Sequence, residues 1–333
     1  MSRITGPKIV VIGGGTGSFT LLSGLKNYIH GITAIVNMAD DGGSTGVLRD
    51  ELGALPPGDI RQCLVALSES PRVRELFNYR FSEGTFEGHA FGNLFLTALE
   101  KMTGSFAEAV DVADEVLNVD GQVIPVTLGN VHLIMKQRNH DDIIGEYQIG
   151  NMNFELGEER PELSLSPPAK LNPAAKKAII EADMVVVAPG NLYGSLAPAL
   201  IMPGMKQALK ACRGKVIYVC NLVTKPGQTD NFAVHDFADE IERFIGAPVL
   251  SHVLFNTTKP SKDLLAKYEN DNEYGVDIDK LVLKGRHYKA VGKDLLSKDL
   301  PVYTKGDKIA KSRSFIRHDS DVLARQIMKI YFS

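Results

Sequence analysis

The run Gly13, Gly14, Gly15, Thr16 and Gly17 has the composition of a turn that holds phosphate groups. It follows a short apolar stretch and leads into a segment with helical spacing. Glycines let the backbone approach an anion closely, and a helix N-terminus presents unpaired N–H groups and a positive dipole end. We therefore predict that this turn binds the phosphates of a nucleotide. A tight glycine turn without a ligand is the alternative.

The turn departs from both standard phosphate-binding motifs. In the dinucleotide pattern GxGxxG, counted from Gly13 and Gly15, the third glycine is replaced by Ser18. A P-loop needs Gly-Lys followed by Ser or Thr, and no lysine follows Gly17. Asp40 stands 25 residues after Gly15 and could imitate the ribose-binding carboxylate of an NAD protein. An NAD(P)-binding oxidoreductase therefore stays an alternative.

Two neighbouring carboxylates, Asp40 and Asp41, follow the second predicted strand. Beside a phosphate site they could hold Mg²⁺ or orient a substrate hydroxyl, so we take both as catalytic candidates. Asp40 is also the candidate magnesium ligand, because neighbours on an extended chain cannot both point inward. Ser44 and Thr45 in the same turn are predicted phosphate contacts. A capped turn in solvent is the alternative for this segment.

A second glycine turn is expected to close the same crevice from the opposite side. Gly190 and Asn191 follow a buried strand, and Ser195 lies just beyond them. Asn221 and Thr224 follow the next strand. Ligands of parallel α/β sheets bind at the carboxyl ends of the strands, so we predict that these five residues contact the ligand.

Four further residues are candidates for the same ligand. Arg61 could reach a phosphate, although surface arginines are common. Asn93 could read a base or a sugar hydroxyl, or cap its helix, and Asp59, two residues before Arg61, could be the N-cap of another helix. Tyr268 and Arg317 could clamp a uracil ring or a diphosphate, with ordinary surface positions as the alternative.

The elements that must position these residues alternate between strands and helices. Lys8 to Ile12 and Thr33 to Met38 form apolar runs typical of strands buried on both faces, with a helix over Ser18 to His30 between them. The same pattern returns after residue 173. We predict an α/β fold: a three-layer α/β/α, Rossmann-like, mainly parallel sheet within one large domain, residues 1–333.

Three segments interrupt or extend this pattern. Strands are expected over 123–127 and 131–136, with Gly129-Asn130 as a hairpin turn between them. Residues 139–172 are polar and contain prolines, and are predicted to form a β excursion with long loops. Residues 259–315 are charged and are predicted to form an irregular C-terminal lobe, which a protein partner could use if the chain is a scaffold.

Composition excludes several classes of protein. The chain has 333 residues, 44% hydrophobic and 23% charged, with a net charge of −3. The basic residues are spread along the chain, so no nucleic-acid partner is expected. The apolar runs are too short to span a membrane, and no signal peptide is apparent. Three scattered cysteines favour a reducing, cytoplasmic location. The oligomeric state is open, and a homo-oligomer is compatible with the sequence.

Four motifs in a fixed order resemble a known family. They are GGGTG at 13–17, DDGGSTGVLR at 40–49, PGDIRQCL at 57–64 and HAFGNL at 89–94. Together with the later stretches 189–195 and 220–229 they are similar to the YvcK/CofD-like family. The length and the segment 316–319 make the chain more similar to the gluconeogenesis factor branch than to the 2-phospho-L-lactate transferase branch.

The resemblance implies a Rossmann-like fold and a nucleotide ligand. Transferase members use Mg²⁺ to move a phospholactyl group from a guanylylated donor to a deazaflavin hydroxyl. The gluconeogenesis factor branch is associated with growth and cell shape on gluconeogenic carbon sources, and with binding UDP-sugars such as UDP-N-acetylglucosamine. We therefore expect a UDP-sugar-binding regulator, with a transferase as the alternative and no tightly bound organic cofactor. Three residues depart from the family pattern: Ala188 replaces the usual glycine, Asn191 replaces the usual serine, and Gln228 replaces a common glutamate.

Overall fold

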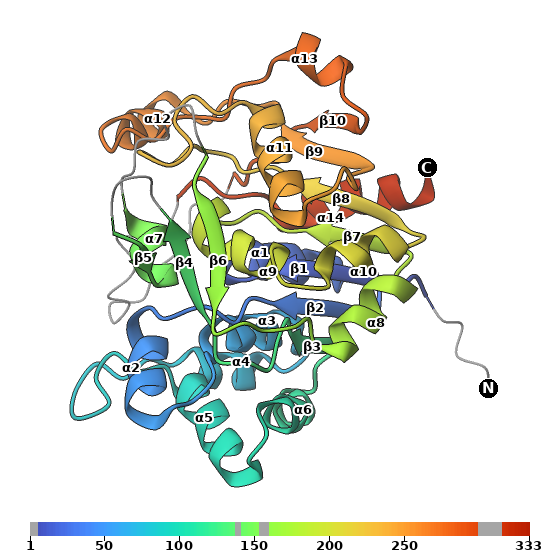
Figure 1. The fold of residues 1–333 in the computed structure, drawn as a ribbon. Coiled ribbons are helices and arrows are strands. Elements are labelled where there is room, and N and C mark those ends of the chain that lie inside the picture. Colours follow the sequence, from blue (N-terminus) through green and yellow to red (C-terminus); the bar gives the residue numbers. More distant parts are fainter. Residues whose placement is uncertain (1–5, 137–140, 153–159, 299–314) are drawn as a thin grey trace.

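The computed structural model describes residues 6–136, 141–152, 160–298 and 315–333. Its centre is a seven-stranded sheet in the order β10-β9-β8-β7-β1-β2-β3, in which every neighbouring pair is parallel (Figure 1). The strands are β1 (Ile9–Gly13), β2 (Ile32–Val36), β3 (Gly121–Pro125), β7 (Met184–Val187), β8 (Lys215–Val219), β9 (His252–Asn256) and β10 (Lys289–Lys293). The predicted Rossmann-like α/β fold is confirmed.

Helices cover both faces of this sheet. On one face α1 (Gly15–Leu25) packs against α3 (Gly58–Leu67) and α14 (Ser320–Phe332). On the other face, drawn in front in Figure 1, α8 (Pro173–Glu181), α9 (Ala197–Leu200), α10 (Met205–Ala211) and α11 (Val234–Ile245) form a second group. Strands β1 and β7 are fully buried between these layers, as their continuous apolar runs require.

Other helices extend the first half of the chain and the C-terminal side. They are α2 (Gly43–Leu52), α4 (Pro71–Asn78), α5 (Phe91–Thr103), α6 (Phe106–Leu117), α12 (Lys262–Glu269) and α13 (Lys280–Lys284). None of the helices in the described ranges is both long enough and apolar enough to cross a bilayer.

The strand order reverses between β1 and β7. From β1 the chain continues to β2 on one side, whereas from β7 it continues to β8 on the other. The connecting segments therefore diverge at the carboxyl ends of β1 and β7, which leaves a crevice there. Gly13 ends β1 at this crevice, and Ala188 follows β7 beside it, its N–H bonded to the Ile12 carbonyl at 2.9 Å.

A small antiparallel sheet lies beside the crevice. It has the order β5 (Ile143–Ile144), β4 (His132–Lys136), β6 (Glu162–Ser166), and a short helix, α7 (Glu146–Asn151), follows β5. Part of the predicted excursion over 139–172 falls here; residues 139–140 and 153–159 lie outside the described ranges.

The predicted hairpin of 123–127 with 131–136 is wrong. Strand β3 pairs with β2 in the main sheet, and β4 pairs with β5 and β6 in the small one. Arg49 holds the connection between β3 and β4, since its guanidinium donates to Asn130 Oδ1 at 2.6 Å and to the Val131 carbonyl at 2.9 Å. This anchor on α2 directs the chain from one sheet to the other.

The C-terminal segment 259–315 is more regular than predicted. It contains α12 and α13, and its residues 289–293 form β10, one of the two edge strands of the main sheet. The prediction of an irregular lobe is therefore wrong for β10; residues 299–314 lie outside the described ranges.

Candidate functional site

The glycine turn lies between β1 and α1, with Gly14 as the N-cap residue of the helix. Gly15 has φ +63°, a conformation that favours glycine. Gly14 is required for packing, because a Cβ there would lie 2.0 Å from Asp59 Oδ2. Gly17 likewise faces the Pro189 carbonyl oxygen, 1.9 Å from an added Cβ. Thr16 is exposed at the helix start. The turn has the geometry predicted for a phosphate site, but close packing alone also accounts for Gly14 and Gly17.

A carboxylate contacts this turn. The sequence suggested Asp59 as an N-cap residue. Instead, Pro57 is the N-cap of α3, and Asp59 lies in the first turn of this helix. Its Oδ1 accepts a hydrogen bond from the Gly15 N–H at 3.0 Å. Burial, and then the charge of Asp40, raise the pKa of Asp59 to about 7. The first amide of α1 is thus already bonded to a protein carboxyl group.

Three acidic side chains gather around the turn: Asp40, Asp59 and Glu146. Asp40 accepts a hydrogen bond from the Gly42 N–H at 3.0 Å and one from the Thr45 hydroxyl, while burial raises its pKa. Burial, and then the charges of Asp40 and Asp59, raise the pKa of Glu146 to about 8. Sequence reasoning missed Glu146, because it lies in a segment without a periodic pattern.

Magnesium fits this cluster only in one mode. In the described part of the chain, no three His, Cys, Asp or Glu side chains are spaced to hold a metal ion. Mg²⁺, however, commonly binds through one or two carboxylates together with waters and substrate phosphates. Asp40, half-buried beside a second carboxyl group, could supply such ligation if the nucleotide supplied phosphate oxygens.

Four polar residues from three segments form one hydrogen-bonded chain. Arg61 Nε donates to Asn93 Oδ1 at 2.9 Å, and Asn93 Nδ2 donates to Ser44 Oγ at 3.2 Å. Ser44 Oγ lies 3.0 Å from His89 Nδ1. The structure therefore brings together three predicted site residues, Ser44, Arg61 and Asn93, of which Arg61 and Asn93 are buried.

Several predicted ligand contacts instead hold helix α7. Asp41 Oδ1 accepts a hydrogen bond from the Tyr147 N–H at 2.7 Å. The Ser195 hydroxyl donates to Glu146 Oε1 at 3.3 Å. Asn191 Nδ2 donates to the Gly150 carbonyl at 3.1 Å. Both ends of α7 are thus attached to residues at the carboxyl edge of the main sheet.

The C-terminal end of α7 has two further donors. Buried Gln228 donates from Nε2 to the carbonyls of Ile149 and Met152, both at 2.9 Å. The Lys225 ammonium donates to the Gly150 carbonyl, and burial lowers the pKa of Lys225. A carboxylate could not donate these bonds, so glutamine at position 228 suits this contact better than a glutamate would.

Asn221 and Thr224 connect loops of the protein to one another. Asn221 Nδ2 donates to the Gly190 carbonyl at 2.8 Å, and its Oδ1 accepts from the Gly190 N–H at 3.4 Å. The Thr224 hydroxyl accepts from the Tyr274 N–H at 3.1 Å. Both side chains therefore shape the carboxyl edge of the sheet through contacts with the backbone.

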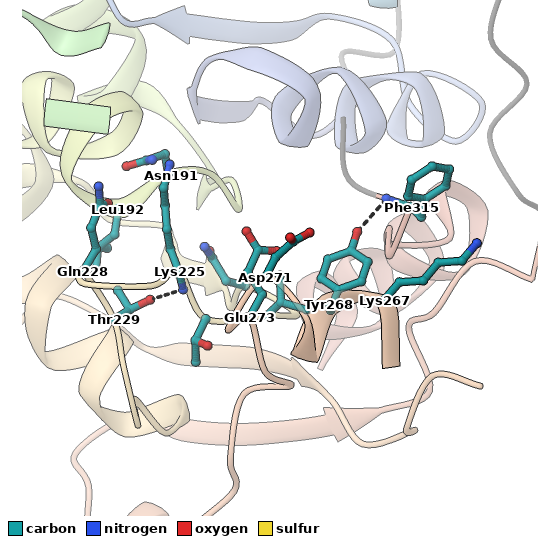
Figure 2. A pocket seen from close by; sticks show the side chains of 13 residues that line it. Asn191, Leu192, Lys225, Gln228, Thr229, Lys267, Tyr268, Asp271, Glu273 and Phe315 are labelled. Carbon is teal, nitrogen blue, oxygen red and sulfur yellow. Dashed lines mark hydrogen bonds between the residues drawn. The ribbon is translucent and has the colours of Figure 1, made fainter. Parts of the chain in front are cut away.

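A pocket of about 420 Å³ opens beside these loops (Figure 2). Its walls include four predicted residues, Asn191, Asn221, Thr224 and Tyr268. The remaining lining residues were not among the predicted site residues: Leu192, Val223, Lys225, Gln228, Thr229, Lys267, Asp271, Glu273 and Phe315. Two lysines and two carboxylates make it a polar pocket of mixed charge.

Tyr268 and Arg317 lie at the C-terminal side of this pocket. The Tyr268 hydroxyl accepts hydrogen bonds from the backbone N–H groups of Phe315 and Ile316, at 2.6 and 3.0 Å (Figure 2 shows the first). Arg317 follows directly, and its carbonyl accepts from the Ser297 N–H at 2.8 Å. Tyr268 therefore positions the segment that carries Arg317, although Arg317 is not one of the described residues lining the pocket.

The chain matches one known protein family over most of its length. The family model described as 2-phospho-L-lactate transferase CofD matches residues 9–296. The chain belongs to the CofD family. Relatives of this CofD-family protein include the gluconeogenesis factor of Bacillus subtilis, 36% identical over 328 residues, which are 97% of this chain and 98% of that protein. A protein of Nostoc sp. is 41% identical over 332 residues, 98% of this chain and 69% of that protein.

Solved structures confirm the fold of the CofD-family protein. The crystal structure of protein BH3568 from Bacillus halodurans is 33% identical, with a TM-score of 0.86, and the match covers 97% of this chain and 99% of that one. The chain is thus a CofD-family protein that is similar to proteins named gluconeogenesis factor and shares the fold of BH3568.

Proposed function

We propose that this CofD-family protein binds a nucleotide diphosphate compound, in the first place a UDP-sugar, and acts as a regulator needed for cell shape and growth on gluconeogenic carbon sources. The observation that carries the binding proposal is the pocket of Figure 2, where Asn191, Asn221, Thr224 and Tyr268 meet two lysines. The regulatory role is supported by the name of the Bacillus subtilis relative, a gluconeogenesis factor.

The pocket offers suitable chemistry for a diphosphate. Lys225 lies in its wall and already donates to a carbonyl, an acceptor that a phosphate oxygen could replace. Lys267 adds a second ammonium group at the Tyr268 side. The carboxylates of Asp271 and Glu273 would repel a phosphate group that has no bound metal ion. Mg²⁺ bound to the ligand would reduce this repulsion.

Isothermal titration calorimetry tests the binding proposal. The purified protein is titrated with UDP-N-acetylglucosamine, UDP and GDP, with and without Mg²⁺. Lys225→Met should weaken UDP-sugar binding at least tenfold, whereas Lys210→Met, at an exposed position on α10, should leave it unchanged. If the wild-type protein binds no uridine nucleotide under any of these conditions, the proposal is wrong.

A growth assay tests the regulatory role. The gene is expressed in a Bacillus subtilis strain lacking its own gluconeogenesis factor, with glucose or a gluconeogenic carbon source. Restored growth and rod shape with the wild-type gene, but not with Lys225→Met at equal protein level, support regulation through the pocket. Full restoration by Lys225→Met would separate the regulatory role from ligand binding.

A transferase is the second candidate, and the half-buried carboxyl groups beside the glycine turn favour it. Asp59, with a pKa of about 7, and Asp40 lie together beside the glycine turn, where one could accept a proton from an attacking hydroxyl. Incubation with guanylylated phospholactate and a deazaflavin should then give phospholactyl-deazaflavin and GMP, as the phosphoanhydride bond of the donor breaks and the deazaflavin hydroxyl forms the new phosphoester. Turnover no greater than that of Asp40→Asn would rule this activity out.

A further inference from the structure

A second pocket, of about 560 Å³, lies at the carboxyl ends of β8 and β9. The loop after β8, the loop after β9 and the segment between α12 and α13 form its walls. Its lining includes Asn221 and Thr224, which also line the pocket of Figure 2. The two pockets therefore lie on either side of the same pair of side chains.

The inner wall of the second pocket is apolar. Phe232, Val234 and Phe255 are buried there. The charged lining residues, Lys259 and Glu269 among them, are exposed. No charged side chain of the described lining is buried in the pocket, so it suits an uncharged group.

Much of the polar capacity of this pocket is already used. Asn256 Oδ1 accepts from the N–H groups of Thr258 and Leu295 at 3.2 and 3.1 Å, and its Nδ2 donates to the Thr258 carbonyl at 2.6 Å. Asn221 and Thr224 are bonded to the backbone of Gly190 and Tyr274. A polyhydroxylated sugar would leave many hydroxyls unpaired here, and a phosphate would lack charged donors in the inner part.

The walls are fixed before any ligand arrives. The Thr224 N–H donates to the Tyr274 carbonyl at 2.7 Å, and the Val276 N–H donates to the Leu222 carbonyl at 3.2 Å. The Val234 N–H donates to the Asp277 carbonyl at 2.9 Å. These bonds attach the segment after α12 to the loop after β8. A preformed pocket costs little ordering on binding.

We propose that this pocket receives the base of the nucleotide, an inference that rests on the proposed nucleotide binding. A base is flat, uncharged and able to stack on aromatic side chains, and Phe232, Phe255 and Tyr274 all line the pocket. The hydroxyls of Thr257 and Thr258 at its rim offer partners for the polar edge of the base. The ribose then passes Asn221 and Thr224, and the diphosphate enters the lysine-containing pocket.

Filling the pocket tests this inference. Gly275 lines it, and a Cβ added there meets no atom within 4 Å, so Gly275→Trp should occupy the space without strain in the fold. Calorimetry measures the affinities of UDP, uridine and pyrophosphate, with Gly285→Trp outside the pocket as the control. We expect Gly275→Trp to lower the affinities for UDP and uridine at least tenfold and to leave the affinity for pyrophosphate unchanged. Lys225→Met should lower the affinity for pyrophosphate and leave the affinity for uridine unchanged.

Two results would overturn the inference. One is wild-type affinity of Gly275→Trp for UDP, provided that its thermal unfolding matches that of the control; Thr258→Trp, at the exposed rim, repeats the measurement if Gly275→Trp does not fold. The other is equal affinity of the wild-type protein for UDP and pyrophosphate. Both results leave nucleotide binding itself intact, whereas a wild-type protein that binds no UDP overturns the proposed function as well.

Discussion

Asp59 Oδ1 lies 3.0 Å from the backbone nitrogen of Gly15, at the first amide of α1. Helix N-termini commonly bind anions at this kind of position, and here a carboxyl group of the protein occupies it. Because burial raises the pKa of Asp59 to about 7, its charge changes within the physiological range. Asp59 thus makes the glycine turn sensitive to pH.

We expect the free energy of unfolding to fall as the pH rises from 5 to 8. The folded-state pKa of Asp59, about 7, lies above its usual value of 3.8, so between these values the folded protein keeps a proton that the unfolded chain has lost. Asp59→Asn keeps the acceptor for Gly15 but removes the titration. Its melting temperature should rise relative to wild type over this pH range, whereas exposed Asp50→Asn should not change the slope. Parallel plots of melting temperature against pH for Asp59→Asn and wild type would contradict this prediction.

Gly14→Ala should destabilise the protein even without a ligand. The added methyl would lie 2.0 Å from Asp59 Oδ2, and overpacking of this kind costs about 1–3 kcal/mol. Gly285→Ala, whose methyl would lie 3.6 Å from its nearest neighbour, serves as the control. Thermal and urea unfolding measure the difference. The double variant Gly14→Ala/Asp59→Ala should recover part of the loss; no recovery would show that the clash is not the cause.

Gln228→Glu should release the C-terminal end of α7. The variant loses the donors to the Ile149 and Met152 carbonyls and places a carboxylate among carbonyl oxygens, at a cost of roughly 1–3 kcal/mol or more. Hydrogen exchange should become faster at the amides of 146–152. Gln148→Glu, exposed on α7, should have little effect. Unchanged exchange in Gln228→Glu would mean that these bonds do not hold the helix.

Tyr268→Phe should weaken ligand binding while keeping the ring in the pocket. It removes the hydroxyl that accepts hydrogen bonds from the N–H groups of Phe315 and Ile316, which costs about 1–3 kcal/mol. We expect lower stability and a several-fold loss of UDP-sugar affinity, because the segment carrying Arg317 is no longer held. Tyr79→Phe, at an exposed position, is the control. Equal UDP-sugar affinities of Tyr268→Phe and wild type would show that the Tyr268 hydroxyl does not contribute to binding.

The central strands were predictable from the sequence, and two other features were not. Strands β1 and β7 are buried on both faces, which requires continuous apolar residues and so leaves a clear pattern. Strand β10 has only partly buried residues and stands in a charged segment, so its sequence resembles a loop. The false hairpin arose because the Gly129-Asn130 signal is local, whereas pairing of β3 with β2 depends on distant residues.

The same distinction applies to the site. The glycine turn was predicted because its signal lies within five neighbouring residues. The contact of Asp59 with Gly15 joins residues 44 apart, and that of Asp41 with Tyr147 joins residues 106 apart. The amide of Asn221 was placed at the correct edge, but residue type does not distinguish a backbone partner from a ligand. The role of Glu146 could be recognised only from the fold, which brings it beside the glycine turn.

The pairing of β1 with β7 sets the order of events during synthesis. Ile9 aligns with Met184, 175 residues later in the chain, so β1 cannot gain its second neighbour until β7 has left the ribosome. At roughly 5–20 residues per second this takes on the order of ten to thirty-five seconds. During that interval the apolar edge of β1 is open to pairing with other chains. The nascent protein is therefore expected to depend on chaperones until its central strand is enclosed.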